Sequence, residues 1–173
     1  MSTHSIYFDA EVDEESVRAA IMELRDIADH PSIKEIEFII NSGGGSVPDG
    51  TALFSELRAL SEHAGNGRFH IVTKVRGWAG SIATLLVQAG DHRVQGELDV
   101  QMWHEPSMSA RDEFQSVLKA RLESMENYER RTAELIAERC GVSYWDIRSL
   151  SQPWDREILG SEALSLQLVD EVA

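Results

Sequence analysis

The sequence contains little cysteine and no long apolar run. Cys140 is the single cysteine among 173 residues, which excludes an internal disulfide and any metal site built from several cysteine ligands. No stretch reaches the roughly 18 consecutive apolar residues of a membrane-spanning helix, and no basic and apolar leader opens the chain. We therefore expect a cytoplasmic protein in a reducing compartment, with no membrane partner.

Basic residues are scarce as well. There are 16 Lys and Arg against 30 Asp and Glu, and the formal net charge is -14 at pH 7. Such a surface repels phosphates and anionic lipids, which argues against a nucleic-acid partner. The histidines show no His-Glu-x-x-His or related spacing, so no metal site is predicted. The length and the 42% of hydrophobic residues suit one domain over residues 1–173.

The first half of the chain alternates strand and helix patterns. Strand patterns at 6–8, 33–40 and 69–75 each precede a helix pattern, the first of which begins after the capping residue Asp13. This order predicts the α/β class, with a parallel sheet and right-handed crossovers. Active sites in such sheets collect at the carboxyl ends of the strands.

Two turns are expected at that edge of the sheet. Gly43, Gly44 and Gly45 follow the strand at 33–40 and expose backbone N–H groups. Ser81 follows small residues and opens an apolar helical segment, which predicts a tight strand-to-helix turn. Small residues allow close approach, and a helix start favours developing negative charge. Ser81 is thus a candidate nucleophile, although an ordinary turn with a buried serine fits this stretch equally well.

The longest helical pattern runs from about 109 to 139 and stops before Gly141. A helix of about 30 residues spans about 45 Å, so we expect it to project from the domain. Its apolar stripe, which includes Phe114 and Leu122, would then pack on another copy of the chain. The alternative is a solvated helix covered with charged residues.

A serine nucleophile needs a general base and an acid that orients the base. His104 differs from the other five histidines because it ends a strand pattern and lies at the rim of the sheet. The others, including His63 and His70, are interpreted as surface or packing residues. Spacing does not select an acid among the carboxylates.

Four segments resemble the proteolytic subunit of the Clp protease, ClpP. Residues 38–47 resemble the family's Y-I-N-S-P-G-G-S-V, 77–82 its G-Q-A-A-S-M, and 100–106 its V-M-I-H-Q-P. Residues 154–170 resemble its D-R-x-x-S-A-x-E-A-x-x-x-G-L-V-D. The likeness covers about 6–172, and the motifs occur in the family's order.

The resemblance implies the ClpP/crotonase fold, with repeated βαβ units and a projecting "handle" helix at about 109–140. The head would comprise about 1–106 and 141–173, and the handle region about 107–140. Homo-oligomeric rings stacked through the handle helices are implied as well. No cofactor is implied.

The resemblance also implies residue roles for a serine endopeptidase. Ser81 would be the nucleophile, His104 the general base and Asp155 the orienting acid. The backbone N–H groups of Gly45 and Ile82 would form the oxyanion hole.

The implied substrate is a peptide or unfolded protein. It would lie in an extended conformation against Gly44, Ser46 and Trp78.

Some positions depart from the family pattern. Gly43 replaces proline, Trp78 replaces glutamine and Gln167 replaces glycine. The chain begins near its first core strand, so we expect no axial-loop segment and no dependence on an AAA+ unfoldase. This short form also resembles phage head-maturation proteases.

Three alternatives stay open. One is a catalytically silent, ClpP-like structural subunit. Another is a crotonase-type acyl-CoA enzyme, and the third is a Ser-Lys peptidase that uses Lys119.

Overall fold

The computed structural model describes residues 2–107, 114–152 and 155–173. Its elements in chain order are β1 (Ser2–Phe8), α1 (Glu14–Ala28), β2 (Ile33–Ser42), α2 (Val47–Leu60), β3 (His70–Gly80), α3 (Ala83–Val87), β4 (His92–Gln95), β5 (Val100–Trp103), α4 (Gln115–Cys140), α5 (Tyr144–Arg148), β6 (Arg156–Ile158), α6 (Gly160–Ser165) and β7 (Glu171–Val172). They divide into two compact units, residues 1–103 with 157–173 and residues 104–156.

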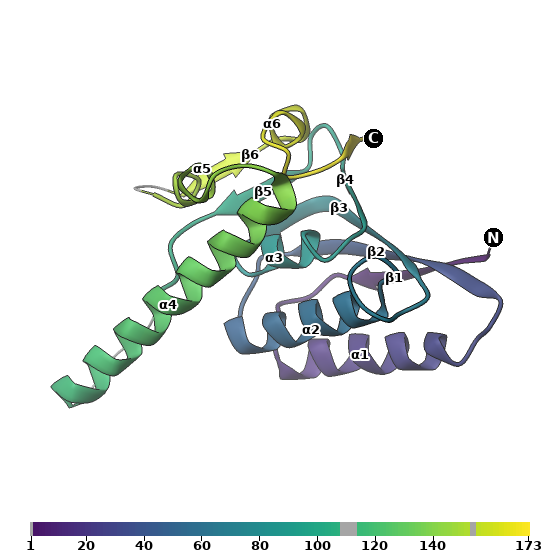
Figure 1. The fold of residues 1–173 in the computed structure, drawn as a ribbon, viewed down its shortest axis with the longest axis horizontal. Coiled ribbons are helices and arrows are strands. Elements are labelled where there is room, and N and C mark those ends of the chain that lie inside the picture. The colour runs from purple at the N-terminus through teal and green to yellow at the C-terminus, as the bar shows by residue number, and fades with distance from the viewer. Residues whose placement is uncertain (1, 108–113, 153–154) are drawn as a thin grey trace. The chain divides into compact units, whose positions relative to one another are not determined.

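The first unit is built on a sheet whose main path runs β1-β2-β3-β4-β7. The strand pairs along this path, and the pair of β3 with β5, are parallel. The predicted α/β fold with a parallel sheet is therefore confirmed. Helices α1 and α2 lie side by side along the sheet (Figure 1).

The central strand β3 is longer than expected and changes partners along its length. Residues 72–75 pair with β4, whereas residues 78–80 pair with β5. The small residues at 77–80, which the sequence pattern assigned to a turn, therefore continue the strand. This continuation brings the end of β5 beside Gly80, the last residue of β3.

Helix α1 shows how local sequence sets an element. The Asp13 side chain accepts a hydrogen bond of 2.8 Å from the Ser16 backbone N–H, and this bond lowers the pKa of Asp13. The buried face is formed by Val17, Ala20, Leu24 and Ile27. The predicted cap and helix are both confirmed.

The core of the first unit is centred on one face of β2 and β3. Ile36, Phe38 and Ile40 of β2 are completely buried, as are Ile71 and Val75 of β3. Each such side chain contributes about 1.5–3 kcal/mol through burial. The two strands that carry the glycine turn and Ser81 are therefore the rigid centre of this unit.

The second unit contains α4, a 26-residue helix that Gly141 ends in the left-handed conformation at φ 66°. A start at about 109 was expected, but 109–113 lie outside the described residues. Phe114 has an extended backbone and precedes the first helical residue, Gln115. No helix in the described ranges is long and apolar enough to cross a membrane.

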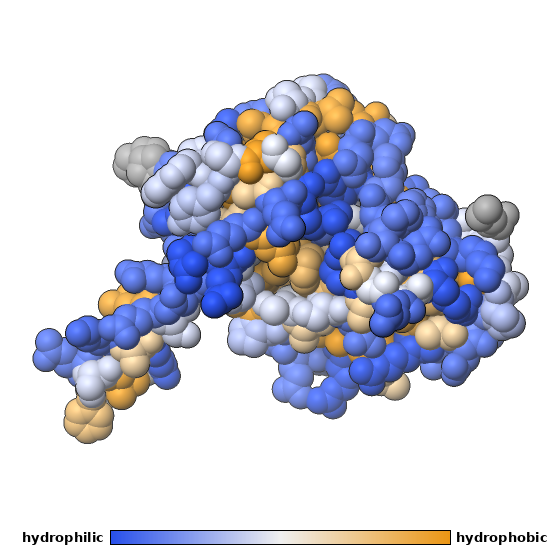
Figure 2. All heavy atoms as spheres, viewed as in Figure 1, coloured by the Kyte–Doolittle hydropathy of each residue, from blue (hydrophilic) through white to orange (hydrophobic). Residues whose placement is uncertain are grey.

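The two ends of α4 differ in burial. Ala133, Ile136, Ala137 and Cys140 near its C-terminus are buried. Near its start, Phe114 is 81% and Leu122 51% exposed, and apolar surface shows between charged residues along the helix (Figure 2). The predicted apolar stripe is thus covered only toward the end of the helix.

Candidate active site

Ser81 lies between β3 and α3 in a strained turn. Its φ is 54°, a left-handed value that costs a residue other than glycine about 1–2 kcal/mol. Its N–H donates to the Met102 carbonyl at 2.9 Å, and its own carbonyl accepts from the Thr84 hydroxyl at 2.7 Å. These bonds hold the turn from both sides. The predicted strand-to-helix turn is confirmed, with a half-buried serine at its tip.

The glycine turn after β2 packs directly against the Ser81 turn. Gly44 has φ 94°, and a Cβ built on it would lie 2.6 Å from the Gly80 carbonyl oxygen and 2.8 Å from the Ser81 Cβ. Its N–H donates to the Ser42 hydroxyl at 3.2 Å. Only glycine permits this backbone contact, so the proximity of Gly80 and Ser81 explains the glycine at position 44.

Gly45 lies beside Val12 in a short parallel bridge. The Val12 N–H donates to Gly44 at 2.8 Å, and the Ser46 N–H donates to Val12 at 2.7 Å. This pattern skips the N–H of Gly45, which has no acceptor among the described residues. Gly45 is solvent-exposed, so its N–H is available to a ligand.

The N–H of Ile82 likewise has no acceptor within the described part of the chain. The Cβ built on Gly44 would lie 3.3 Å from this nitrogen, so the glycine turn reaches the start of α3. The structure thus brings together Ser81 and the two turns that carry the predicted oxyanion donors. Two unpaired N–H groups on adjoining turns can stabilise a developing oxyanion.

Two of the predicted substrate-contacting side chains flank these turns. The Trp78 ring folds over Gly80, since a Cβ there would lie 2.6 Å from the indole Nε1 and 2.9 Å from the Gly43 carbonyl. The Ser46 side chain caps α2 by accepting from the Asp49 N–H at 3.5 Å. Both side chains are half-buried.

Two residues that sequence reasoning did not single out also position Ser81. They are Met102, through its carbonyl, and Thr84, through its hydroxyl. No sequence signal marks a backbone carbonyl as a functional group, because every residue carries one.

His104 and Asp155 belong to the second unit. His104 follows β5 directly, and the exposed Asp155 directly precedes β6, which pairs with β5. Within the described part of this unit, no hydrogen bond joins their side chains; the neighbouring Glu105 carboxylate accepts one from the Gln152 amide. The roles of His104 and Asp155 in catalysis therefore stay predictions.

A candidate metal-binding group lies elsewhere, at the opposite end of β3. Among the described residues, Glu62, His63 and His70 each direct one ligand atom to within 4.8 Å of the others. The candidate active site itself consists of hydroxyl and backbone groups.

The comparison with known families agrees with this geometry. The family model described as Clp protease matches residues 1–173. The chain belongs to the Clp protease family. The resemblance to ClpP-like peptidases is thereby confirmed, and members of this family form oligomeric rings that act on peptides.

One curated relative is the "ATP-dependent Clp protease proteolytic subunit 3" of Rhodococcus jostii (strain RHA1). It is 28% identical over 170 residues, which cover 97% of this chain and 80% of the relative. The similarity therefore extends over both units of this Clp family protein.

Proposed function

We propose that this Clp family protein is a serine endopeptidase that hydrolyses peptide bonds through an acyl-enzyme on Ser81. The observation that carries the proposal is the strained Ser81 turn, which lies against the glycine turn and beside two N–H groups that have no acceptor among the described residues. A strained strand-to-helix turn is a recurrent way to expose a nucleophilic serine.

In the proposed reaction, the Ser81 Oγ attacks the peptide carbonyl carbon as His104 takes the hydroxyl proton. The carbonyl oxygen becomes an oxyanion, which the N–H groups of Gly45 and Ile82 stabilise. The intermediate then collapses, the C–N bond breaks, and His104 gives its proton to the leaving amine. Water attacks the acyl-enzyme in the same manner and releases the acid and Ser81.

Asp155 would orient the His104 imidazole and stabilise its protonated form. Chain connectivity supports this role, because His104 and Asp155 adjoin β5 and β6, two strands that pair with each other. The substrate backbone would lie extended along Gly44 and Ser46, with Trp78 bordering the groove.

Labelling with a fluorophosphonate probe tests the nucleophile. The intact protein should label once per chain, and Ser81→Ala should not label. His104→Ala should label at least about 10³-fold more slowly than the intact protein. Ser55→Ala removes an exposed serine on α2 and should label normally. Labelling of Ser81→Ala would contradict the proposal, and an unlabelled intact assembly would favour the silent structural subunit.

Assembly through α4 is part of the proposal. The exposed Phe114 and Leu122 would pack on α4 of another copy, since such side chains are costly to leave in water. Native mass spectrometry should show that Leu122→Glu forms smaller particles, whereas the exposed polar change Glu126→Gln keeps the wild-type particle. The projection of α4 from the head stays a prediction. Electron microscopy of the same particles would test it.

Independence from an AAA+ unfoldase also stays a prediction. The Rhodococcus relative is named as ATP-dependent. Degradation with and without ATP therefore distinguishes this prediction from the behaviour that the relative's name describes. An unfolded protein substrate should be degraded by the purified protein without ATP. Degradation only with ATP and an added unfoldase would contradict this expectation.

A further inference from the structure

The amino-terminal end of β3 carries a second group of chemically active side chains. Ser61 and Phe69 form a parallel bridge, in which the Glu62 N–H donates to the Phe69 carbonyl at 2.9 Å. This backbone pairing places Glu62 beside His70, the first residue of β3. Residues eight positions apart in the chain are thus held side by side by backbone hydrogen bonds.

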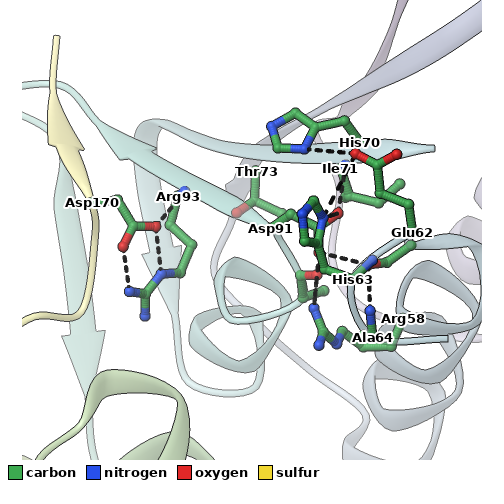
Figure 3. A network of polar contacts seen from close by, with 12 residues as sticks. Arg58, Glu62, His63, Ala64, His70, Ile71, Thr73, Asp91, Arg93 and Asp170 are labelled. Carbon is green, nitrogen blue, oxygen red and sulfur yellow. Dashed lines mark hydrogen bonds and ion pairs between the residues drawn. The ribbon is translucent and has the colours of Figure 1, made fainter.

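The side chains of Glu62, His63 and His70 converge on one point. The Glu62 Oε1 lies 3.5 Å from the His70 Nδ1 and 3.7 Å from the His63 Nδ1. The two imidazole rings are 5.8 Å apart between centroids and meet edge to face. Figure 3 shows both rings close to the Glu62 carboxylate.

These distances fit a bound cation better than they fit hydrogen bonds. N–H···O hydrogen bonds measure about 2.7–3.2 Å, which is shorter than either separation. A tetrahedral zinc ion with bonds of about 2.0–2.2 Å holds its ligand atoms about 3.3–3.6 Å apart. The two separations that involve Glu62, 3.5 Å and 3.7 Å, lie within or close to this range, and all three ligand atoms lie within 4.8 Å of one another.

Asp91, whose side chain is 3% exposed, anchors the segments that carry this group. Its Oδ1 accepts from the Ser61 hydroxyl at 2.6 Å, and its Oδ2 accepts from the Ile71 N–H at 2.9 Å. The Ser61 oxygen in turn accepts from the His63 N–H at 3.0 Å. One buried carboxylate therefore ties down the neighbours of all three converging side chains, which limits the cost of ordering them.

The local charge also suits a cation. The Arg58 guanidinium, 3.4 Å from the Asp91 Oδ1, offsets the buried carboxylate, and burial lowers the pKa of Arg58. The Arg58 charge is thus directed to Asp91, whereas the Glu62 carboxylate lies beside the two imidazoles. The side chains of Glu62 and His63 are 46% and 64% exposed, so an ion has open access.

We propose that Glu62, His63 and His70 form a binding site for a borderline divalent cation of the zinc type, with water completing the coordination. Two imidazoles with one carboxylate suit Zn²⁺, Co²⁺ or Ni²⁺. Mg²⁺ and Ca²⁺ prefer shells made only of oxygen. The site does not depend on the proposed peptidase activity.

The position of the site indicates its effect. His70 and Ser81 lie at opposite ends of β3, about 35 Å apart at about 3.3 Å per residue. A bound ion would crosslink the loop after α2 to the start of β3. It would stabilise the folded state without entering the chemistry at Ser81.

Calorimetric titration of the full chain with ZnCl₂ tests the proposal, using protein without a polyhistidine tag that has been treated with a chelator. We expect one Zn²⁺ per chain and a rise of Tm with Zn²⁺ concentration. Loss of a residue that only hydrogen-bonds a metal ligand typically weakens metal binding by about 10–100-fold. His70→Gln removes a ligand itself, so it should weaken Zn²⁺ binding by more than this. Ser61→Ala removes the hydroxyl that accepts from the His63 backbone N–H, and it should weaken Zn²⁺ binding less than His70→Gln does.

His92→Gln is the matched control. Its side chain is 37% exposed against 35% for His70, and within the described ranges it pairs with one carboxylate, that of Glu171, at 2.8 Å. This variant should bind Zn²⁺ as the wild type does. If His70→Gln fails to fold, His63→Gln at the more exposed position provides the same comparison.

Co²⁺ provides a second readout, because its visible absorption reports nitrogen and oxygen ligands in a low-coordinate site. The Co²⁺ spectrum should vanish in His70→Gln and persist in His92→Gln. Equal Zn²⁺ affinity in the wild type and in both His63→Gln and His70→Gln would overturn the proposal. Displacement of Zn²⁺ by equimolar Mg²⁺ would overturn the assigned class of cation.

Discussion

The two ends of β3 use different chemical groups. At its carboxyl end, the functional atoms are mostly backbone: the N–H groups of Gly45 and Ile82 beside a strained Ser81. At its amino end, they belong to the side chains of Glu62 and His70, which a buried carboxylate helps to position. One strand therefore carries a candidate catalytic site and a candidate metal site.

This difference has a physical origin. Parallel strands leave N–H groups unpaired where the chain turns toward the next helix, and small residues allow two such turns to touch. At the other end the chain enters the sheet from a loop, and polar side chains must satisfy the entering backbone, as Asp91 does for Ile71. Substitutions at the carboxyl end should therefore affect catalysis, and those at the amino end stability.

The largest expected effect is at Gly44. Gly44→Ala would drive its methyl group into Gly80 and Ser81, so peptide hydrolysis should fall by about 10²–10³-fold, as when an oxyanion donor is displaced. Gly43→Ala is the matched control, because nothing lies within 4 Å of a Cβ built there. Steady-state kinetics of both variants check this prediction, and equal rates would break the comparison.

At the amino end, Asp91→Ala should cost about 3 kcal/mol of unfolding free energy, because the Ile71 N–H and the Ser61 hydroxyl lose their buried acceptor. Urea denaturation measures this loss. The exposed Asp26→Ala on α1 should change stability by less than about 0.5 kcal/mol. A folded Asp91→Ala protein that had lost hydrolysis but not stability would reverse the assignment of the two ends.

An ion pair away from both ends of β3 joins Arg93 of β4 to Asp170, which directly precedes β7, and it provides a further test of stability. The Arg93 side chain is 6% exposed and bonds Asp170 through Nε at 2.9 Å and Nη2 at 2.6 Å. Burial alone would raise the pKa of Asp170, but the hydrogen bonds from Arg93 lower it below 3.8. Asp170→Asn should cost about 2 kcal/mol at pH 7.

The pH dependence of this pair follows from the lowered pKa. A carboxylate with a lower pKa in the folded state stabilises the protein fully above its unfolded pKa, and the contribution is lost as pH falls through the folded value. The difference in urea stability between wild type and Asp170→Asn should therefore shrink below about pH 4. A difference that did not change between pH 7 and pH 3 would show that the charge on Asp170 is not the cause.

The smallest effect is expected at Gln167, which has φ 59°. Gln167→Gly should stabilise the protein by about 1 kcal/mol, because glycine adopts this conformation without strain. Ser165→Gly, in the last position of α6, should instead destabilise it by about 0.5–1 kcal/mol. Thermal denaturation of the two variants should shift Tm in opposite directions, and shifts in the same direction would contradict the strain argument.

Elements with a local cause were predictable from sequence. The Asp13 cap and the apolar spacing of α1 need only neighbouring residues, and both are confirmed. The end of β3 was missed because residues 77–80 are strand only through pairing with β5. The start of α4 was placed at about 109, whereas Phe114 is extended and the helix begins at Gln115.

The two candidate sites also differed in how far the sequence could predict them. Gly44 and Ser81 could be recognised because backbone geometry restricts which residues fit, and that restriction leaves a pattern of small residues. His63 and His70 were interpreted as surface or packing residues because their spacing matches no metal-binding pattern. Their proximity to Glu62 follows from a bridge between Ser61 and Phe69.

The order of strands and helices, the two turns and the family were determined by the sequence alone, because hydrophobic periodicity and glycine placement act over short distances along the chain. Tertiary structure decided that the glycine turn touches Ser81, that two N–H groups find no acceptor in the described part of the chain, and that Glu62 meets two imidazoles. These are relations between distant segments, and they arise only when parallel strands bring those segments into register.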